Sequence, residues 1–293
     1  MVSIHARCND VFIGHAIASY FDTSTQLAQE LSESLLTLES FNGSDIMSRY
    51  LYLYHTKRCD FGETLKIVYQ NLKDKIMINE SLPISRENCR FDQLIIDETV
   101  KITDGKLGGH TAGCGPVHRS FPLALCSWID DDDLFELSMK EAALTHYSSL
   151  AGQVSGIVNL ICRSLIKNRP WRDAVQSAFT TPSLHKDVSS IYGRYNRWSD
   201  LGKQTHPAYA PAVLIEALHY IANSTNAIDA IEKATTKKNS YCLPIIGILA
   251  SARWGFPLDM YNDKIKDGQL KIIRDTANKL SNQWCLQQHN IYA

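Results

Sequence analysis

The sequence predicts an all-α fold, as one multi-helix domain over residues 1–293, and three observations support this prediction. Apolar residues recur at three- and four-residue steps through most of the chain, as they do in amphipathic helices. No alternating strand pattern persists for more than a few residues. Neither a repeat nor a break in composition marks a linker.

The helical periodicity defines a series of segments in chain order. They are 26–38, 45–55, 63–72, 133–146, 151–168, 170–178, 208–223, 226–235, 242–254 and 269–284. Ser44 or Asp45 is suited to cap the segment 45–55, and Asn226 with Asp229 suits the start of 226–235.

Two other stretches carry less periodicity. Asn168 and Pro170 separate the segments 151–168 and 170–178. The region from Asn79 to Lys106 shows no clear pattern, and we expect it to be rich in loops. The acidic run Asp130–Asp133 favours a solvated N-terminal cap for a helix beginning near Leu134 over a metal cluster, because consecutive helical residues point in different directions.

Composition excludes several classes of protein. Apolar residues make up 44% and charged residues 21% of the chain, which is ordinary for a packed soluble domain. Lys plus Arg (30) nearly cancel Asp plus Glu (31), so no strong field would recruit nucleic acid or an anionic membrane. Polar residues interrupt the stretch Met1–Ala28, which therefore resembles neither a signal peptide nor a membrane span. We expect a cytoplasmic protein with no nucleic-acid or membrane partner.

The cysteines indicate free thiols. Eight of them are scattered without C-x-x-C spacing, at positions 8, 59, 89, 114, 126, 162, 242 and 285. Cys126 and Cys162 lie in apolar runs and are expected to pack as small hydrophobes. Cys114, beside glycines, is the one thiol placed where reactivity would be useful, although a structural role is favoured there too.

Two loops and one helix start are candidates for function. Residues 105–120 hold five glycines in sixteen positions, which lets backbone N–H groups approach a bound anion, with His118 and Arg119 as further donors. A flexible surface turn is the alternative. The loop Trp198–Lys203 lines the same cleft or merely connects two helices. Lys237 and Lys238 immediately precede an apolar helix, and helix starts are common phosphate sites.

Four motifs in order resemble the ADP-ribosylglycohydrolase superfamily, which includes arginine- and serine-ADP-ribose hydrolases, dinitrogenase-reductase-activating glycohydrolases and J-type lens crystallins. They are Gly14–Asp22, which is similar to the family's opening Gly-Asp-Ala-Leu-Gly helix; the glycine-rich loop through Arg119 to Pro122-Leu123-Ala124; Leu144-Thr145-His146; and the helix Gly247–Gly255. The resemblance extends from about Ile13 to about Pro257 and implies the same all-α fold.

The resemblance implies two Mg²⁺ ions, held by a Thr-Asp-Asp triplet near the N-terminus and an Asp-x-Asp-Thr sequence near the C-terminus. The first falls within Asp22-Thr23-Ser24-Thr25, and the second on Lys238, Asn239, Ser240 and Tyr241. Only Asp22 keeps a carboxylate, and Lys238 adds positive charge, so we predict no dinuclear site. The degenerate metal positions are therefore Asp22, Thr23, Ser24, Lys238, Ser240 and Tyr241. His15 replaces the acid of the opening helix, and a neutral, hydrogen-bonded core residue is favoured there over a base.

Three hypotheses for function follow from the resemblance. The first is a structural protein like the J-type crystallins. The second is a metal-independent binder of ADP-ribose or a related nucleotide, with no cofactor, in which Lys238 neutralises phosphate. Its ligand-binding residues are Gly113, Cys114, Gly115, His118, Arg119, Gly202 and Lys238. The third is an active ADP-ribosyl hydrolase with a rearranged site, using Mg²⁺ and with Asp22 as acid and His15 or His118 as base. The sequence leaves the oligomeric state open.

Overall fold

Helices form the regular secondary structure of the protein, as the sequence predicts. The computed structural model describes residues 2–56, 60–76, 85, 89–194, 206–236, 241–258 and 267–284. Within these ranges the chain has no β-strand, and one isolated antiparallel bridge pairs Gly113 with Tyr209. The helices are α1 (Ile4–Ala18), α2 (Thr23–Leu38), α3 (Gly43–Thr56), α4 (Gly62–Ile76), α5 (Gln93–Lys106), α6 (Gly115–Arg119), α7 (Pro122–Leu125), α8 (Leu134–Ala143), α9 (Ser149–Ile166), α10 (Trp171–Ala178), α11 (Lys186–Ser189), α12 (Ile191–Arg194), α13 (Ala210–Ala222), α14 (Ala227–Thr235), α15 (Leu243–Trp254) and α16 (Asp267–Leu280).

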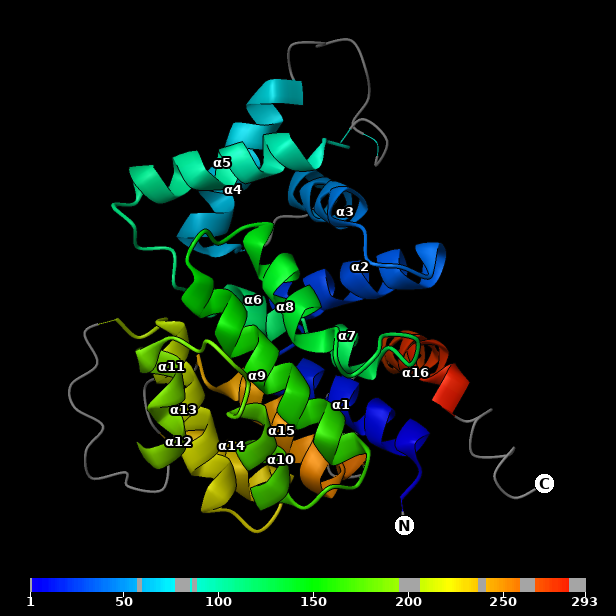
Figure 1. Cartoon of the computed structure of the whole chain (residues 1–293). Coiled ribbons are helices and arrows are strands. Elements are labelled where there is room, and N and C mark those ends of the chain that lie inside the picture. Colours follow the sequence, from blue (N-terminus) through cyan, green and yellow to red (C-terminus); the bar gives the residue numbers. More distant parts are fainter. Residues whose placement is uncertain are drawn as a thin grey trace.

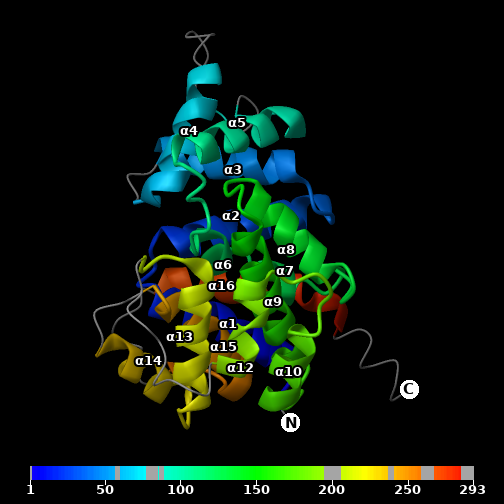
Figure 2. The ribbon, with the colours of Figure 1, turned by 60° about the vertical axis from the view of Figure 1, so that its left-hand side comes forward.

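The helices pack around α1, α9 and α15, which lie side by side in the interior (Figures 1 and 2). Helices α3, α4 and α5 together form one end of the molecule in both views. Helix α16, near the C-terminus, packs against α1 and α2, and α13 and α14 pack against α15. This arrangement brings the first and last thirds of the chain into contact.

Helices α1 and α15 cross at two glycines. A Cβ on Gly247 would lie 2.5 Å from the carbonyl oxygen of Gly14 and 2.7 Å from the Cβ of Ala18, and a Cβ on Gly14 would lie 2.8 Å from the carbonyl oxygen of Gly247. The two backbones approach this closely because neither position carries a side chain. The contact of Gly247 with Ala18 also brings the beginning of α15 to the end of α1, from which the chain runs into α2.

Replacing Gly247 with alanine is expected to lower the free energy of unfolding by about 1–3 kcal/mol, because the added methyl group would force the two helix backbones apart. Urea unfolding measures this change. The matched control is Gly105→Ala, because a Cβ at Gly105 meets nothing within 4 Å. That control should be neutral or slightly stabilising, since alanine is the better helix former. An equal effect of the two substitutions would contradict the close crossing.

Helix α9 is the central helix of the fold. It contacts α6, α8, α10, α13 and α15. It is long and apolar enough to cross a membrane by length and composition, but 72% of its 18 residues are buried inside the protein, as in a core helix. Gly152 and Gly156 allow α8 to approach, because a Cβ there would collide with Met139 and Phe135, respectively.

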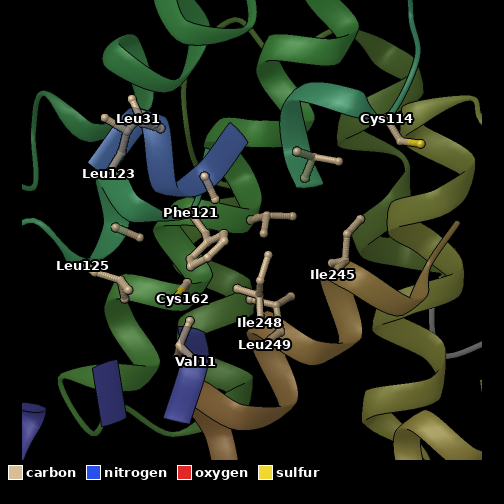
Figure 3. Close-up of a cluster of buried hydrophobic side chains, with 14 of the residues drawn as sticks. Val11, Leu31, Cys114, Phe121, Leu123, Leu125, Cys162, Ile245, Ile248 and Leu249 are labelled. Carbon is tan, nitrogen blue, oxygen red and sulfur yellow. The ribbon is translucent and has the colours of Figure 1, made fainter. Parts of the chain in front are cut away.

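The hydrophobic core joins side chains from distant parts of the sequence (Figure 3). Val11 of α1, Leu31 of α2, Cys162 of α9 and Ile248 of α15 belong to one cluster, together with Phe121 before α7. The rings of Phe12 and Phe121 meet edge to face, with centroids 4.8 Å apart. Each fully buried apolar side chain of this kind contributes about 1.5–3 kcal/mol, so this cluster fixes how α1, α2, α9 and α15 pack.

The structure corrects two details of the sequence analysis. The region from Asn79 to Lys106 is not all loop, because residues 93–106 form α5. Neither Ser44 nor Asp45 caps α3; the side chain of Asn42 does, accepting a hydrogen bond of 3.0 Å from the N–H of Asp45. The predicted cap of α14 is confirmed, because the Asn226 side chain accepts a bond of 2.9 Å from the N–H of Asp229.

The acidic run precedes α8 as predicted, but the side chain of Asp133, at the N-cap position, makes no capping hydrogen bond. Asp131 has a role that the sequence does not show. Asp131 pairs with Arg163 at 2.9 Å and with Lys167 at 2.7 Å. Arg163 also donates to the carbonyl oxygens of Leu123, Ala124, Cys126 and Ile129. This buried arginine therefore satisfies the C-terminal end of α7, and Asp131 balances its charge.

Candidate functional site

The chain turns sharply between α1 and α2, and Asp22 begins the second helix. Its Oδ1 accepts hydrogen bonds from the N–H of Ser24 (2.8 Å), the hydroxyl of Ser24 (2.6 Å) and the N–H of Thr25 (3.4 Å). Thr25 also shares a bond of 2.8 Å with Ser19, the residue after α1. The carboxylate of Asp22 is thus the N-cap of α2, which fixes it in place beside the end of α1.

Two buried histidines lie next to this cap. The Nε2 atom of His15 is 3.4 Å from the Ser24 hydroxyl, and the His15 ring packs against Phe121 at an interplanar angle of 39°, with centroids 4.5 Å apart. Burial, together with the charge of the nearby His118, lowers the pKa of His15 to about 3. At neutral pH His15 is an uncharged core residue, as the sequence analysis favours.

His118 connects α6 to the beginnings of α2 and α15. Burial lowers its pKa to about 4, against the opposing influence of the Asp22 carboxylate and of a hydrogen bond with the backbone of Tyr241. Only 8% of His118 is exposed, and its Nε2 has no hydrogen-bond partner among the described residues. A neutral imidazole with one buried, unpaired ring nitrogen is therefore held in α6, next to the beginnings of α2 and α15.

The glycine-rich loop is an ordered segment rather than a flexible turn. The N–H of Cys114 donates to the carbonyl of Ala208 (2.9 Å), and the N–H of Ala210 donates to the carbonyl of Ala112 (2.9 Å). The loop is therefore attached to the start of α13. The Cys114 thiol is buried, and burial raises its pKa to about 12, so it has the character of a structural cysteine and not of a nucleophile.

Two of the glycines pack directly on His146. A Cβ at Gly113 would lie 3.3 Å from His146 Nε2, and a Cβ at Gly115 would lie 3.4 Å from its Cε1. The other ring nitrogen of His146 shares a hydrogen bond of 2.8 Å with the hydroxyl of Thr145. The His146 ring thus packs against the loop, and larger residues at positions 113 and 115 would push the loop away from it.

Arg119 lies beneath the site and does not face it. Its guanidinium donates to Glu141 Oε1 at 2.6 Å and to Thr145 Oγ1 at 2.8 Å, and neither Arg119 nor Glu141 has exposed side-chain surface. The expectation that Arg119 donates to a ligand is therefore corrected: the buried carboxylate of Glu141 holds it in the core. Its role is to anchor Thr145, and through Thr145 the histidine that supports the loop.

Tyr50 and Glu141, two members of this network, are not predicted from the sequence. Tyr50 donates a hydrogen bond of 2.8 Å to Glu141 Oε1, and its ring faces the Arg119 guanidinium at 5.1 Å. Arg119 Nη1, Glu141 Oε2 and the Tyr69 hydroxyl are buried without a hydrogen-bond partner among the described residues. Nothing in the spacing of a lone glutamate among alanines, or of a tyrosine on an apolar face, distinguishes these side chains from solvated or core residues.

The remaining predicted site residues divide into two groups. Thr23 is the first residue of α2, and Tyr241 lies just before α15 with 44% of its surface exposed. Gly202, Lys238 and Ser240 lie outside the described residues. The structure therefore brings Asp22, Ser24, His15, His118 and Tyr241 together. The glycine-rich loop leads directly into α6, the helix that carries His118.

The donors around Asp22 do not by themselves supply the ligands of two magnesium ions. Such ions need several carboxylate oxygens, and here one carboxylate is accompanied by hydroxyls and neutral imidazoles. The Ser24 hydroxyl also donates to Asp22, which occupies part of its capacity to bind a cation. Within the part of the chain that the structure describes, no group of three or more His, Cys, Asp or Glu side chains could hold a metal ion.

Fold and site together define an all-helical domain whose candidate site lies at the beginnings of α2, α6 and α15. The family model for ADP-ribosylglycohydrolase matches residues 5–252, so the chain belongs to the ADP-ribosylglycohydrolase family. A solved structure described as an "ADP-ribosylglycohydrolase-related protein complex" has a TM-score of 0.69 and 18% identity, over 96% of this chain and 99% of that chain. This likeness shows the shared fold. No curated protein matches the chain.

Proposed function

We propose that this ADP-ribosylglycohydrolase family member binds an ADP-ribosyl group or a related nucleotide without paired magnesium ions and without hydrolysing it. The observation that carries the proposal is the state of Asp22. It is the one acid retained at the positions where the family resemblance implies metal ligands, and it is engaged as the N-cap of α2. We place the protein in the cytoplasm, in keeping with its balanced charge.

Three features support a binding role. The beginning of α15 adjoins His118, and a helix N-terminus favours the negative charge of phosphate. Lys237 and Lys238 precede that helix in the sequence and would add positive charge. The Nε2 atom of the neutral His118 is buried without a hydrogen-bond partner among the described residues, and it is suited to a ribose hydroxyl or a phosphate oxygen. These groups together match the chemistry of a phosphorylated ribose.

Calorimetric titration with ADP-ribose, once with Mg²⁺ and once with EDTA, tests the proposal. We expect the same Kd in both buffers and no release of free ADP-ribose from an ADP-ribosylated protein. The matched variant is Lys238→Gln, which should weaken binding because it removes the positive charge that we propose to neutralise phosphate.

The other hypotheses are outcomes of the same titration. Binding that requires Mg²⁺ would contradict metal independence and restore the active hydrolase. Absence of binding in both buffers would contradict the binding role and leave a structural protein of the J-type crystallin kind. A fourfold variant, Thr23→Asp, Ser24→Asp, Lys238→Asp and Ser240→Asp, is expected to gain affinity for Mg²⁺; no gain would contradict the assignment of the degenerate metal positions.

A further inference from the structure

The turn between α1 and α2 contains two consecutive residues in the left-handed backbone region. Tyr20 has a φ of 54° and Phe21 a φ of 53°, and no other two adjacent non-glycine residues in the described chain share this conformation. Aromatic residues adopt it at a cost, so such positions persist where the surrounding structure enforces them. Both lie within two residues of Asp22.

The hydrogen bonds explain why the backbone turns here. The N–H of Tyr20 donates to the carbonyl of Ile17 (3.0 Å), and the N–H of Phe21 donates to the carbonyl of Ala16 (2.8 Å). This pair of bonds is the Schellman motif that ends many helices, with Tyr20 at the position where glycine is preferred. A tyrosine is thus present where helix termination alone would favour glycine.

Packing does not compensate for this choice. Phe21 is partly buried against the hydrophobic core, but 74% of the Tyr20 side chain and backbone surface is exposed. Tyr20 therefore gains little from contact with its own protein. The ring is retained at a strained position with most of its surface facing outward.

Tyr20 lies close to the candidate site. It is two residues from the Asp22 carboxylate, which accepts a hydrogen bond of 2.8 Å from the N–H of Ser24, and the Ser24 hydroxyl lies 3.4 Å from His15 Nε2. We propose that the exposed ring of Tyr20 is a stacking platform for the nucleobase of the bound nucleotide. This inference rests on the proposed function and names the contact that holds the planar part of the ligand, beside the groups that hold ribose and phosphate.

Titration of three Tyr20 variants with AMP and with ribose 5-phosphate tests the proposal. Tyr20→Gly is expected to weaken AMP binding about tenfold, the size of effect that loss of one base–aromatic stack produces. Binding of ribose 5-phosphate should not change, because this ligand has no base. Tyr20→Phe should bind AMP like the wild type. Tyr20→Gly and Tyr20→Asn should both raise Tm by about 2–4 °C, because they relieve the left-handed strain.

The outcomes separate this inference from the proposed function. If the wild type binds ADP-ribose and AMP but Tyr20→Gly binds them equally well, the stacking role is wrong and the binding role stands. An equal loss of affinity for AMP and ribose 5-phosphate would also overturn stacking, since it would show a general disturbance of the site. If the wild type binds neither ligand, both proposals fail together.

Discussion

Replacing Glu141 with glutamine is expected to lower the free energy of unfolding by about 3–5 kcal/mol, the cost of leaving a buried charge without its partner. The Arg119 guanidinium would remain in a site with no exposed surface, 2.6 Å from a group that no longer carries negative charge. Tyr50 would lose its charged acceptor in the same step. Urea unfolding at pH 7 measures the change.

A double variant separates the charge from the packing. Arg119→Met with Glu141→Met replaces the ion pair by apolar side chains, and such replacements are often close to neutral. We therefore expect the double variant to recover most of the stability that Glu141→Gln loses. A loss below about 1 kcal/mol in the single variant would contradict the importance of the pair.

Acidification from pH 6.5 to pH 4 is expected to destabilise the protein steeply. Burial lowers the folded-state pKa of His15 to about 3, that of His118 to about 4, and that of His146 well below its usual 6.5. Below pH 6.5 the unfolded chain takes up protons at these histidines while the folded protein does not. Their contribution to stability is therefore full above pH 6.5 and is lost as pH falls toward the folded pKa values.

One carboxyl group changes the free energy of unfolding in the opposite direction as the pH falls. Burial raises the pKa of Asp10 to about 6, so between pH 6 and pH 4 the folded state binds a proton that the unfolded state does not. The three fully buried histidines against one aspartate leave a net uptake of up to two protons on unfolding, and burial also lowers the pKa of His55, which acts in the same direction. The free energy of unfolding should then fall by up to about 3 kcal/mol per pH unit in this window.

Urea unfolding at pH 7, 6 and 5 measures this slope. His118→Gln should reduce it by up to one proton's share, about 1.4 kcal/mol per pH unit, because the variant cannot titrate. The exposed His110 provides the control for the substitution itself, and His110→Gln should leave the free energy of unfolding at pH 7 unchanged. An equal slope in the wild type and His118→Gln would show that His118 is protonated in the folded state.

Periodicity predicts the long helices well where one face is buried and the other is polar. Periodicity does not predict helix α5, because apolar residues lie on both of its faces. Leu94 is 75% exposed and Ile102 53% exposed, while Ile96 and Val100 are buried. An amphipathic pattern is therefore obscured in the sequence. Its existence depends on packing against α3 and α4, which the sequence of the segment alone does not contain.

The sequence predicts which residues belong to the candidate site better than it predicts how they are arranged. The sequence singles out Asp22, His15 and His118, and the structure brings all three together near the beginning of α2. It does not reveal that Asp22 caps α2, or that Tyr20 occupies the glycine position of a Schellman motif. Both facts depend on backbone dihedral angles, and the residue types present there are not the ones that usually signal them.

The crossing of α1 and α15 also governs when the protein is able to fold during synthesis. The surface that α1 offers to Gly247 stays uncovered until α15 has left the ribosome, 233 residues after Gly14. At 5–20 residues per second this delay is roughly 10–50 s. The nascent chain must keep Val11, Phe12 and Ile13 from other partners for that time, so we expect its yield in cells to depend on chaperones that bind early apolar segments.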